Sequence, residues 1–284
     1  AKAEKKAGRI AAEGLCRVAV KDEGTAAVVE VNSETDFVAK NDEFQGFVET
    51  VVNQIVDSEA ADMDAFMAEA WAADTTKTVK DALVEKIAVI GENLNIRRFE
   101  KVAADNGCVV SYIHGGGRIG VLVVADTDVV NDDIKACLKN VAMQVAAMNP
   151  IAVDEDGVSE EVKQKEIEVA VEKTKVEQVQ KAVEAALKKA NINPAHVDSE
   201  DHMESNMAKG WITAEDVAKA KEIIATVSAE KAANMPEQMI QNIAKGRLAK
   251  FLKEVCLLNQ EDIMDAKKTV REVLKEADPE LKVV

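Results

Sequence analysis

Residues 27–55 read AVVEVNSETDFVAKNDEFQGFVETVVNQI, a strand-like run followed by a loop and an amphipathic helix. In the helical part, apolar residues recur at three- and four-residue spacing and so share one face. They are Phe44, Phe47, Val48, Val51, Val52 and Ile55. Asn41 and Asp42 suit the start of this helix, because their side chains can accept hydrogen bonds from the unpaired amides of its first turn. The stretch predicts a strand and a helix joined by residues 33–40.

The loop at residues 33–40 is where the sequence points to function. It places a carboxylate, Asp36, beside a large apolar ring, Phe37. An apolar ring left in water beside an acid favours a pocket on a partner protein. The alternative is that Phe37 packs into its own core beneath the helix that begins near Phe44.

This strand and helix occur twice along the chain. Residues 27–31 are echoed by residues 120–124, at an offset of 93 (121 minus 28). The helix face is echoed at an offset of 90 (134 minus 44) by Ile134, Cys137, Leu138, Val141, Ala142 and Val145. The first copy therefore has three more residues between its strand and its helix. Those residues fall in the stretch that holds Asp36 and Phe37, which again points to that loop.

A further strand precedes each pair, so each copy begins with a hairpin. Leu15–Val20 turns at residues 21–24, and Val109–His114 turns at three glycines, residues 115–117, which permit positive backbone dihedrals. A further helical stretch is expected from about residue 62 to residue 90. The predicted fold class is α+β: a duplicated strand-strand-helix core with small antiparallel sheets covered by helices.

A helical insertion is expected after the second copy. From about residue 159 to residue 190 the composition shifts to Glu, Lys, Val and Ala. Four valines repeat there every seven residues, as in a coiled-coil seam: Val162, Val169, Val176 and Val183. Polar residues 191–210 break this helix, and Thr213 and Asp216 can cap a returning one. We predict a long antiparallel helical hairpin.

Four segments follow from this organisation. Residues 1–100 form the first core subdomain and residues 101–158 the first part of the second. Residues 159–243 form the helical hairpin, and residues 244–284 return to the core and end in a helix.

Composition and charge argue against several classes of protein. A net charge of −16 disfavours direct nucleic-acid binding, because neutralising phosphates requires clustered Lys and Arg. The chain has no run of about 18 apolar residues and no signal-peptide pattern, so we expect a cytoplasmic protein without a membrane partner. The four cysteines, at positions 16, 108, 137 and 256, show no C-x-x-C spacing, so neither a zinc site nor a disulfide framework is indicated.

Enzyme motifs are largely missing. No P-loop pattern is present. The run His114-Gly-Gly-Gly117 is similar to the oxyanion loop of lipases, but no G-x-S-x-G accompanies it, and a hairpin turn fits better. His196 and His202 show no spacing typical of a metal site. We therefore expect no catalytic residues, no cofactor and no metal. The pattern leaves His114 as either a satisfied turn residue or a contact residue.

Four segments carry a resemblance to a known family. They are residues 30–40 (EVNSETDFVAK), 90–98 (IGENLNIRR), 111–123 (SYIHGGGRIGVLV) and 145–150 (VAAMNP). In this order, with a duplicated core and a helical insertion, the chain resembles bacterial translation elongation factor Ts. The resemblance is close over residues 1–158, resumes near residues 244–260 and is loose between. Family members normally begin with a small helical module, and residues 1–8 resemble the part that follows it. A final strand is expected after residues 275–281.

The resemblance implies a guanine nucleotide exchange factor that acts by binding and not by catalysis. Its partner would be the GTPase elongation factor Tu, in GDP-bound and nucleotide-free forms. Thr35, Asp36, Phe37 and Val38 would enter the GTPase and displace its magnesium ion, and His114 would be a further contact. The alternative is a non-catalytic scaffold or self-associating protein that uses the helical arm, which leaves a homodimer open. A hydrolase using the His114 loop is a third, weaker reading.

Overall fold

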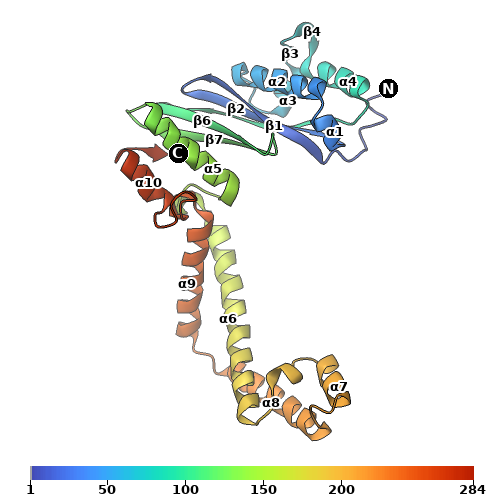
Figure 1. The fold of residues 1–284 in the computed structure, drawn as a ribbon, viewed down its shortest axis with the longest axis vertical. Coiled ribbons are helices and arrows are strands. Elements are labelled where there is room, and N and C mark those ends of the chain that lie inside the picture. Colours follow the sequence, from blue (N-terminus) through green and yellow to red (C-terminus); the bar gives the residue numbers. More distant parts are fainter. Residues whose placement is uncertain (1) are drawn as a thin grey trace. The chain divides into compact units, whose positions relative to one another are not determined.

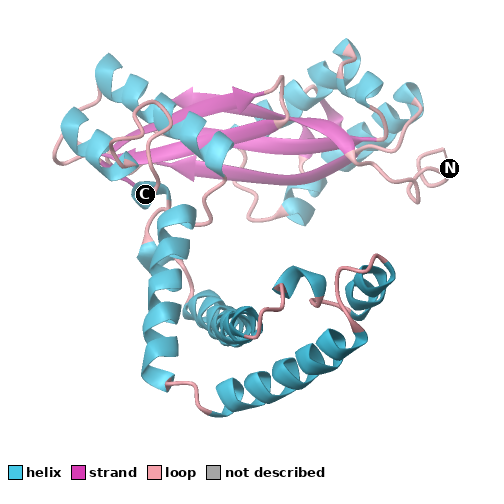
Figure 2. Cartoon of the chain, turned by 60° about the horizontal axis from the view of Figure 1, so that its bottom comes forward, coloured by secondary structure: helices cyan, strands magenta, loops and turns pink. Residues whose placement is uncertain are grey.

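The structure, a computed structural model, describes residues 2–284, which divide into two compact units. The first unit runs to Asp154 and includes Val255–Val284, and the second is Glu155–Glu254. Figure 1 shows strands between helices in the first unit, and Figure 2 shows helices and connecting loops throughout the second. Within residues 2–284, no helix is both long enough and apolar enough to cross a membrane.

The first sheet has three antiparallel strands in the order β1-β2-β5. They are β1 (Glu13–Asp22), β2 (Thr25–Ser33) and β5 (Asn95–Ala103). Helix α2 (Asp42–Asp57) packs on this sheet, and the apolar face predicted from its spacing is buried. The Asn41 side chain caps α2 by accepting hydrogen bonds from the amides of Glu43 and Phe44, as the sequence predicted. The α+β class is confirmed by this arrangement.

The second sheet repeats the pattern and takes its third strand from far along the chain. Its strands are β6 (Gly107–His114), β7 (Ile119–Asp126) and β8 (Lys282–Val283), in that order. Helix α5 (Asp132–Met148) packs on it, and α10 (Val270–Ala277) packs on α5. This core contains Cys108, Val121, Val123, Ala125, Ile134, Leu138, Val141, Ala142, Leu257, Val270, Leu274 and Leu281. The second core is therefore built from two stretches separated by the whole second unit.

The two sheets pack face to face, with α2 and α5 on opposite outer sides (Figure 1). The sheets are in close contact at Gly120 of β7. A Cβ there would stand 2.8 Å from a methyl group of Val28 and 3.1 Å from Cβ of Cys16. Backbone hydrogen bonds join the sheets at both ends, from Cys16 N to Gly117 O (2.6 Å) and from Val109 N to Glu23 O (2.7 Å).

The predicted helical stretch from residue 62 to residue 90 is wrong in its middle. Helix α3 (Met63–Ala68) is followed by a short hairpin of β3 (Ala70–Trp71) and β4 (Asp74–Thr78), and only then by α4 (Val79–Ile90). Three threonines in β4 favour extended backbone because they are β-branched. Thr78 then forms a capping box with Asp81, which starts α4.

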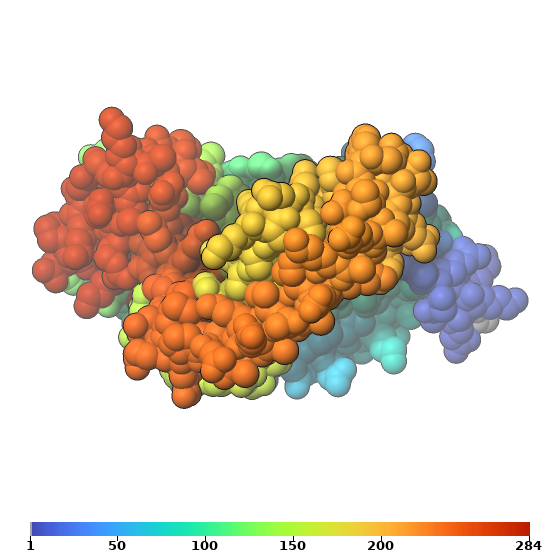
Figure 3. Space-filling view, turned by 90° about the horizontal axis from the view of Figure 1, so that it is seen from below, coloured from blue at the N-terminus to red at the C-terminus, as the bar shows by residue number. Residues whose placement is uncertain are grey.

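The second unit is built around one long helix, α6 (Glu160–Lys189), with α7 (Glu200–Ala208), α8 (Ala214–Ala233) and α9 (Glu237–Val255). Helix α8 lies along α6 (Figure 3). The two helices share a small apolar core. That core contains Leu187, Ile192, Val197, Met203, Ile212, Val217 and Ala220. Residues 191–210, predicted as a polar break, thus contribute a helix and three core side chains.

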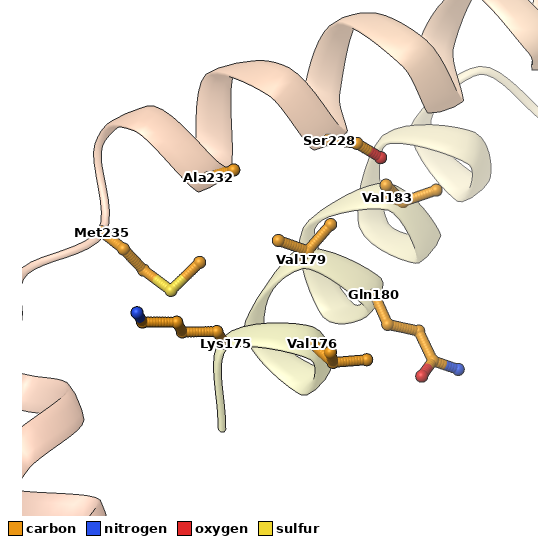
Figure 4. Close-up of a pocket in the computed structure, with 8 residues that line it drawn as sticks. All are labelled: Lys175, Val176, Val179, Gln180, Val183, Ser228, Ala232 and Met235. Carbon is orange, nitrogen blue, oxygen red and sulfur yellow. The ribbon is translucent and has the colours of Figure 1, made fainter. Parts of the chain in front are cut away.

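The predicted heptad seam of α6 is not its packed face. Val169 and Val176 are 47% and 61% exposed, whereas Ala170 and Thr174 are buried. The physical reason is that α6 contacts two helices along its length: α8 in its later part, and α9, through an ion pair between Arg247 and Glu177. Its buried stripe therefore does not follow one seven-residue repeat. Val176 borders an apolar groove between α6 and the end of α8, lined also by Val179 and Met235 (Figure 4).

Two glycines at equivalent positions of the two hairpins, 93 residues apart (107 minus 14), allow their strands to pair closely. Gly14 has φ +132° and Gly107 has φ +146°. A Cβ at these positions would lie 2.1 Å from the carbonyl oxygen of Val31 and 2.0 Å from that of Ala125. No rotamer change relieves such a clash, because both groups are backbone.

We expect Gly14→Ala and Gly107→Ala each to lower the free energy of unfolding, by roughly 1–3 kcal/mol from backbone strain alone. The steric clash adds to this. Denaturant titration of the purified chain measures the change. Gly46→Ala is the matched control, because a Cβ there meets nothing within 4 Å in the middle of α2. It should gain about 0.5–1 kcal/mol, since alanine favours helix over glycine. Unchanged stability of the Gly14 variant would contradict the strand geometry described here.

Candidate partner-binding site

The loop after β2 contains a single turn of helix, α1 (Asp36–Ala39). Thr35 is its N-cap, and its Oγ1 accepts a hydrogen bond from Val38 N at 3.3 Å. Ser33, fully buried at the end of β2, donates from its hydroxyl to the carbonyl oxygen of Thr35 at 3.0 Å. These local bonds give the loop a defined shape.

Phe37 points into solvent from this turn. Its side chain is 81% exposed, whereas the next residue, Val38, packs against the first core. Phe44, seven residues later, occupies the core position and is 0% exposed. The alternative that Phe37 folds beneath α2 therefore does not hold in this structure. An isolated phenyl ring at the tip of a loop is available to a pocket on another protein.

Asp36 stands beside this ring and is also exposed. Lys40, one turn later, places its Nζ 3.0 Å from Oδ2 of Asp36. This hydrogen bond, and the positive charge of Lys40, lower the pKa of the Asp36 carboxyl. The loop thus presents an ionised carboxylate and an apolar ring side by side.

The carboxylate of Glu92, from another part of the chain, accepts hydrogen bonds from this loop. Oε2 of Glu92 accepts from the backbone amides of Glu34 (3.0 Å) and Thr35 (3.1 Å). Oε1 of Glu92 accepts from Oγ1 of Thr35 at 2.7 Å. Glu92 was not among the predicted site residues, although it lies in residues 90–98, one of the four segments that resemble the known family.

His114 lies at the end of β6 and is exposed. Its Nδ1 is 2.8 Å from the hydroxyl of Tyr112, and the two rings are 5.8 Å apart. The three following glycines all have positive φ, and backbone amides of the turn donate to the carbonyl oxygen of His114. The segment is therefore a hairpin turn that presents an imidazole, as the turn interpretation predicted.

The fold brings the two predicted regions to one end of the first unit. Glu13 lies opposite Ser33 in the first sheet, so the start of β1 adjoins the loop that carries Phe37. Cys16, three residues along β1, donates to Gly117 in the His114 turn. A groove between the sheets at this end is lined by Gly14, Asn32, Arg98, Gly117 and Arg118, among others.

The histidine and cysteine side chains of residues 2–284 are the remaining candidates for metal or thiol chemistry. No group of three or more His, Cys, Asp or Glu side chains in this range is arranged to hold a metal ion. His202, one of the histidines considered from sequence, instead pairs with Asp198. No disulfide joins the four cysteines within residues 2–284, and burial raises the pKa of the Cys16, Cys108 and Cys137 thiols, which therefore stay protonated near neutral pH.

Comparison with known proteins gives a consistent result. The profile of a family described as Elongation factor TS matches residues 34–284. A protein named Elongation factor Ts from Bacteroides fragilis is 62% identical over 282 residues, covering 99% of this chain and 83% of that protein. Its namesake from Bacteroides thetaiotaomicron is 59% identical over the same shares. A more distant namesake from Clostridium novyi is 35% identical, covering 99% of this chain and 74% of that protein. The chain therefore belongs to the elongation factor Ts family.

Proposed function

We propose that this chain is a guanine nucleotide exchange factor that binds elongation factor Tu and accelerates its release of GDP. The observation that carries the proposal is the exposed Phe37 ring beside the ionised Asp36, on a loop shaped by its own hydrogen bonds. Membership of the elongation factor Ts family supports the choice of partner. Thr35 and Val38 shape the turn, and His114 adds a contact from the same end of the unit.

The proposed mechanism is a coupling between two ligands of the GTPase. Magnesium bound to a nucleotide bridges phosphate oxygens and offsets their charge. When Phe37 and Asp36 enter the GTPase, they move the groups that hold this ion, and GDP is bound less tightly. A hundredfold loosening requires about 2.8 kcal/mol. Burial of one phenyl ring supplies roughly 1.5–3 kcal/mol, so Phe37 is large enough to act as the wedge.

Two consequences follow for binding. Because the coupling is reciprocal, bound GDP weakens the grip of this chain on the GTPase by the same factor. The chain therefore binds the nucleotide-free form most tightly and leaves when a new nucleotide enters. No group of this chain undergoes a covalent change, since its part is to bind and to displace.

The test is the release of fluorescent GDP from elongation factor Tu with substoichiometric amounts of this chain. We expect faster release, and we expect the acceleration to shrink when a chelator has already removed magnesium, because both act on the same ion. Tight binding to the GTPase without faster release would favour a scaffold. An equal acceleration with and without magnesium would contradict displacement of the ion.

A further inference from the structure

We propose that Glu92 is a positioning residue for nucleotide exchange. It fixes the exchange loop, defined here as residues 34–40, so that Phe37 is already presented before the partner arrives. The inference rests on the proposed exchange function, but the fixing of the loop is a property of this chain alone. Glu92 lies 57 residues from Thr35 in sequence, so the contact is made by the fold.

The local hydrogen bonds of the exchange loop are not enough to hold it in place by themselves. Helix α1 has only four residues, too few for a stable helix by itself, and its residues are not buried. The amides that lead into its first turn have no partner within the turn. Glu92 supplies one carboxylate to two of these amides and to the Thr35 hydroxyl. Hydrogen bonds to an ionised acceptor are stronger than those between neutral groups.

The Thr35 hydroxyl transmits this effect to α1. Its hydrogen points to Oε1 of Glu92 at 2.7 Å, which leaves its lone pairs for Val38 N at 3.3 Å. A hydroxyl has one donor and two acceptor positions, so giving the proton to Glu92 sets its direction. The N-cap of the turn that carries Phe37 is thus oriented by Glu92.

The loop that contains Glu92 and Asn93 also donates a hydrogen bond to the exchange loop. Oε1 of Glu34 accepts from the amide of Asn93 at 2.6 Å. The guanidinium of Arg9 lies 3.6 Å from the same oxygen, and the Asn93 side chain donates to the carbonyl oxygen of Arg9 at 2.8 Å. These contacts therefore join the exchange loop, the loop after α4 and the segment before β1 at one point.

Glu92 is itself held by the core. Helix α4, which precedes it, buries Val79, Leu83 and Ile87 and ends at Gly91. Gly91 has φ +88°, the left-handed conformation that ends a helix and turns the chain. Leu94, two residues after Glu92, is only 3% exposed. The carboxylate is fixed between these anchors, so it can order a loop that lacks buried residues.

This arrangement predicts a specific kinetic signature. Without Glu92 the loop still carries Phe37, but it holds the presenting shape for only part of the time. The apparent affinity then falls by that populated fraction, while the bound complex is unchanged. A positioning role therefore raises the concentration of chain needed for half-maximal GDP release and leaves the maximal rate intact. Loss of Phe37 itself lowers the maximal rate.

The experiment compares the full chain with Glu92→Ala and Glu92→Gln. GDP release from elongation factor Tu is measured against chain concentration, and amide hydrogen exchange of residues 34–38 is measured without the GTPase. For Glu92→Ala we expect a half-maximal concentration raised about tenfold, an unchanged maximal rate and faster exchange of the Glu34 and Thr35 amides. Glu92→Gln keeps an acceptor oxygen, so its half-maximal concentration and its amide exchange should fall between those of wild type and Glu92→Ala. Glu100→Ala, an exposed glutamate on β5, should behave as wild type.

The outcomes separate the two proposals. If the wild-type chain does not accelerate release, the exchange function fails, and amide exchange still reports whether Glu92 orders the loop. If the wild-type chain is active and Glu92→Ala matches it in half-maximal concentration or in amide protection, the positioning role is overturned. A fall in maximal rate alone also overturns it. If Glu92→Ala unfolds at a lower temperature than wild type, the same comparison with Glu92→Gln tests the positioning role.

Discussion

Phe37→Ala should reduce the acceleration of GDP release by about 10- to 100-fold, which corresponds to losing roughly 1.5–3 kcal/mol of ring burial in the partner. The folded chain should be unaffected, because the ring is 81% exposed and contributes nothing to the core. Stopped-flow release of fluorescent GDP measures the first quantity. Thermal or denaturant unfolding measures the second.

Two controls sharpen this result. Val89→Ala removes another exposed apolar side chain, 65% accessible and carried on α4, and should leave release unchanged. Phe37→Leu keeps much of the apolar volume and should retain an intermediate rate. If the Phe37→Ala chain accelerates GDP release as much as wild type does, Phe37 is not the wedge of the mechanism and the scaffold is favoured.

Phe44→Ala should have the opposite effect, destabilising the chain by about 3–5 kcal/mol with little change in the activity of the molecules that remain folded. Phe44 is 0% exposed and lies where α2 meets the first sheet, so its loss leaves a cavity. Typical domains have only about 5–15 kcal/mol of stability, so the unfolding midpoint should fall markedly. Denaturant titration followed by circular dichroism measures this.

Phe44→Leu provides the matched comparison, because it keeps an apolar side chain of similar size and should cost less than about 1.5 kcal/mol. Similar midpoints for the Ala and Leu variants would show that the site collapses around the smaller residue. The two phenylalanines are seven residues apart and identical in chemistry. One should report on exchange alone and the other on folding alone.

The first helix face was predictable because its apolar residues follow helical spacing without interruption. Strand β5 was not identified, and its register shows why. The neighbouring residues Glu30 and Val31 of β2 pair with Arg98 and Ile96, so Arg97 is an extra residue in β5 and the alternation along β5 breaks. Charged residues at 97 and 98 fall together, as they would in a loop.

Helix α6 shows a different limit of prediction from sequence. A seven-residue repeat predicts one partner helix, but α6 contacts two, and its most buried polar residue is Thr174. Its hydroxyl donates to the carbonyl oxygen of Ala170 at 2.6 Å, so it is satisfied without a partner outside the helix. No periodicity of apolar residues signals such a position.

The exchange loop was predictable in part. The first copy has three extra residues in the stretch that holds Asp36 and Phe37, which indicated a functional loop. The structure places the Phe37 ring outside the core. Glu92 was not predictable, because it bonds to backbone amides, which any sequence provides. Only its place in a family-like segment set it apart.

The split construction of the second core has a consequence during synthesis. The first sheet has all its strands once Ala103 has left the ribosome, whereas the second core must wait for Leu281. At roughly 5–20 residues per second, the nascent chain carries the uncovered face of α5 for on the order of ten seconds. During this interval the core that contains Leu138 and Val141 lacks the side chains that α10 contributes to it. A ribosome-associated chaperone that shields apolar helices would find its substrate there.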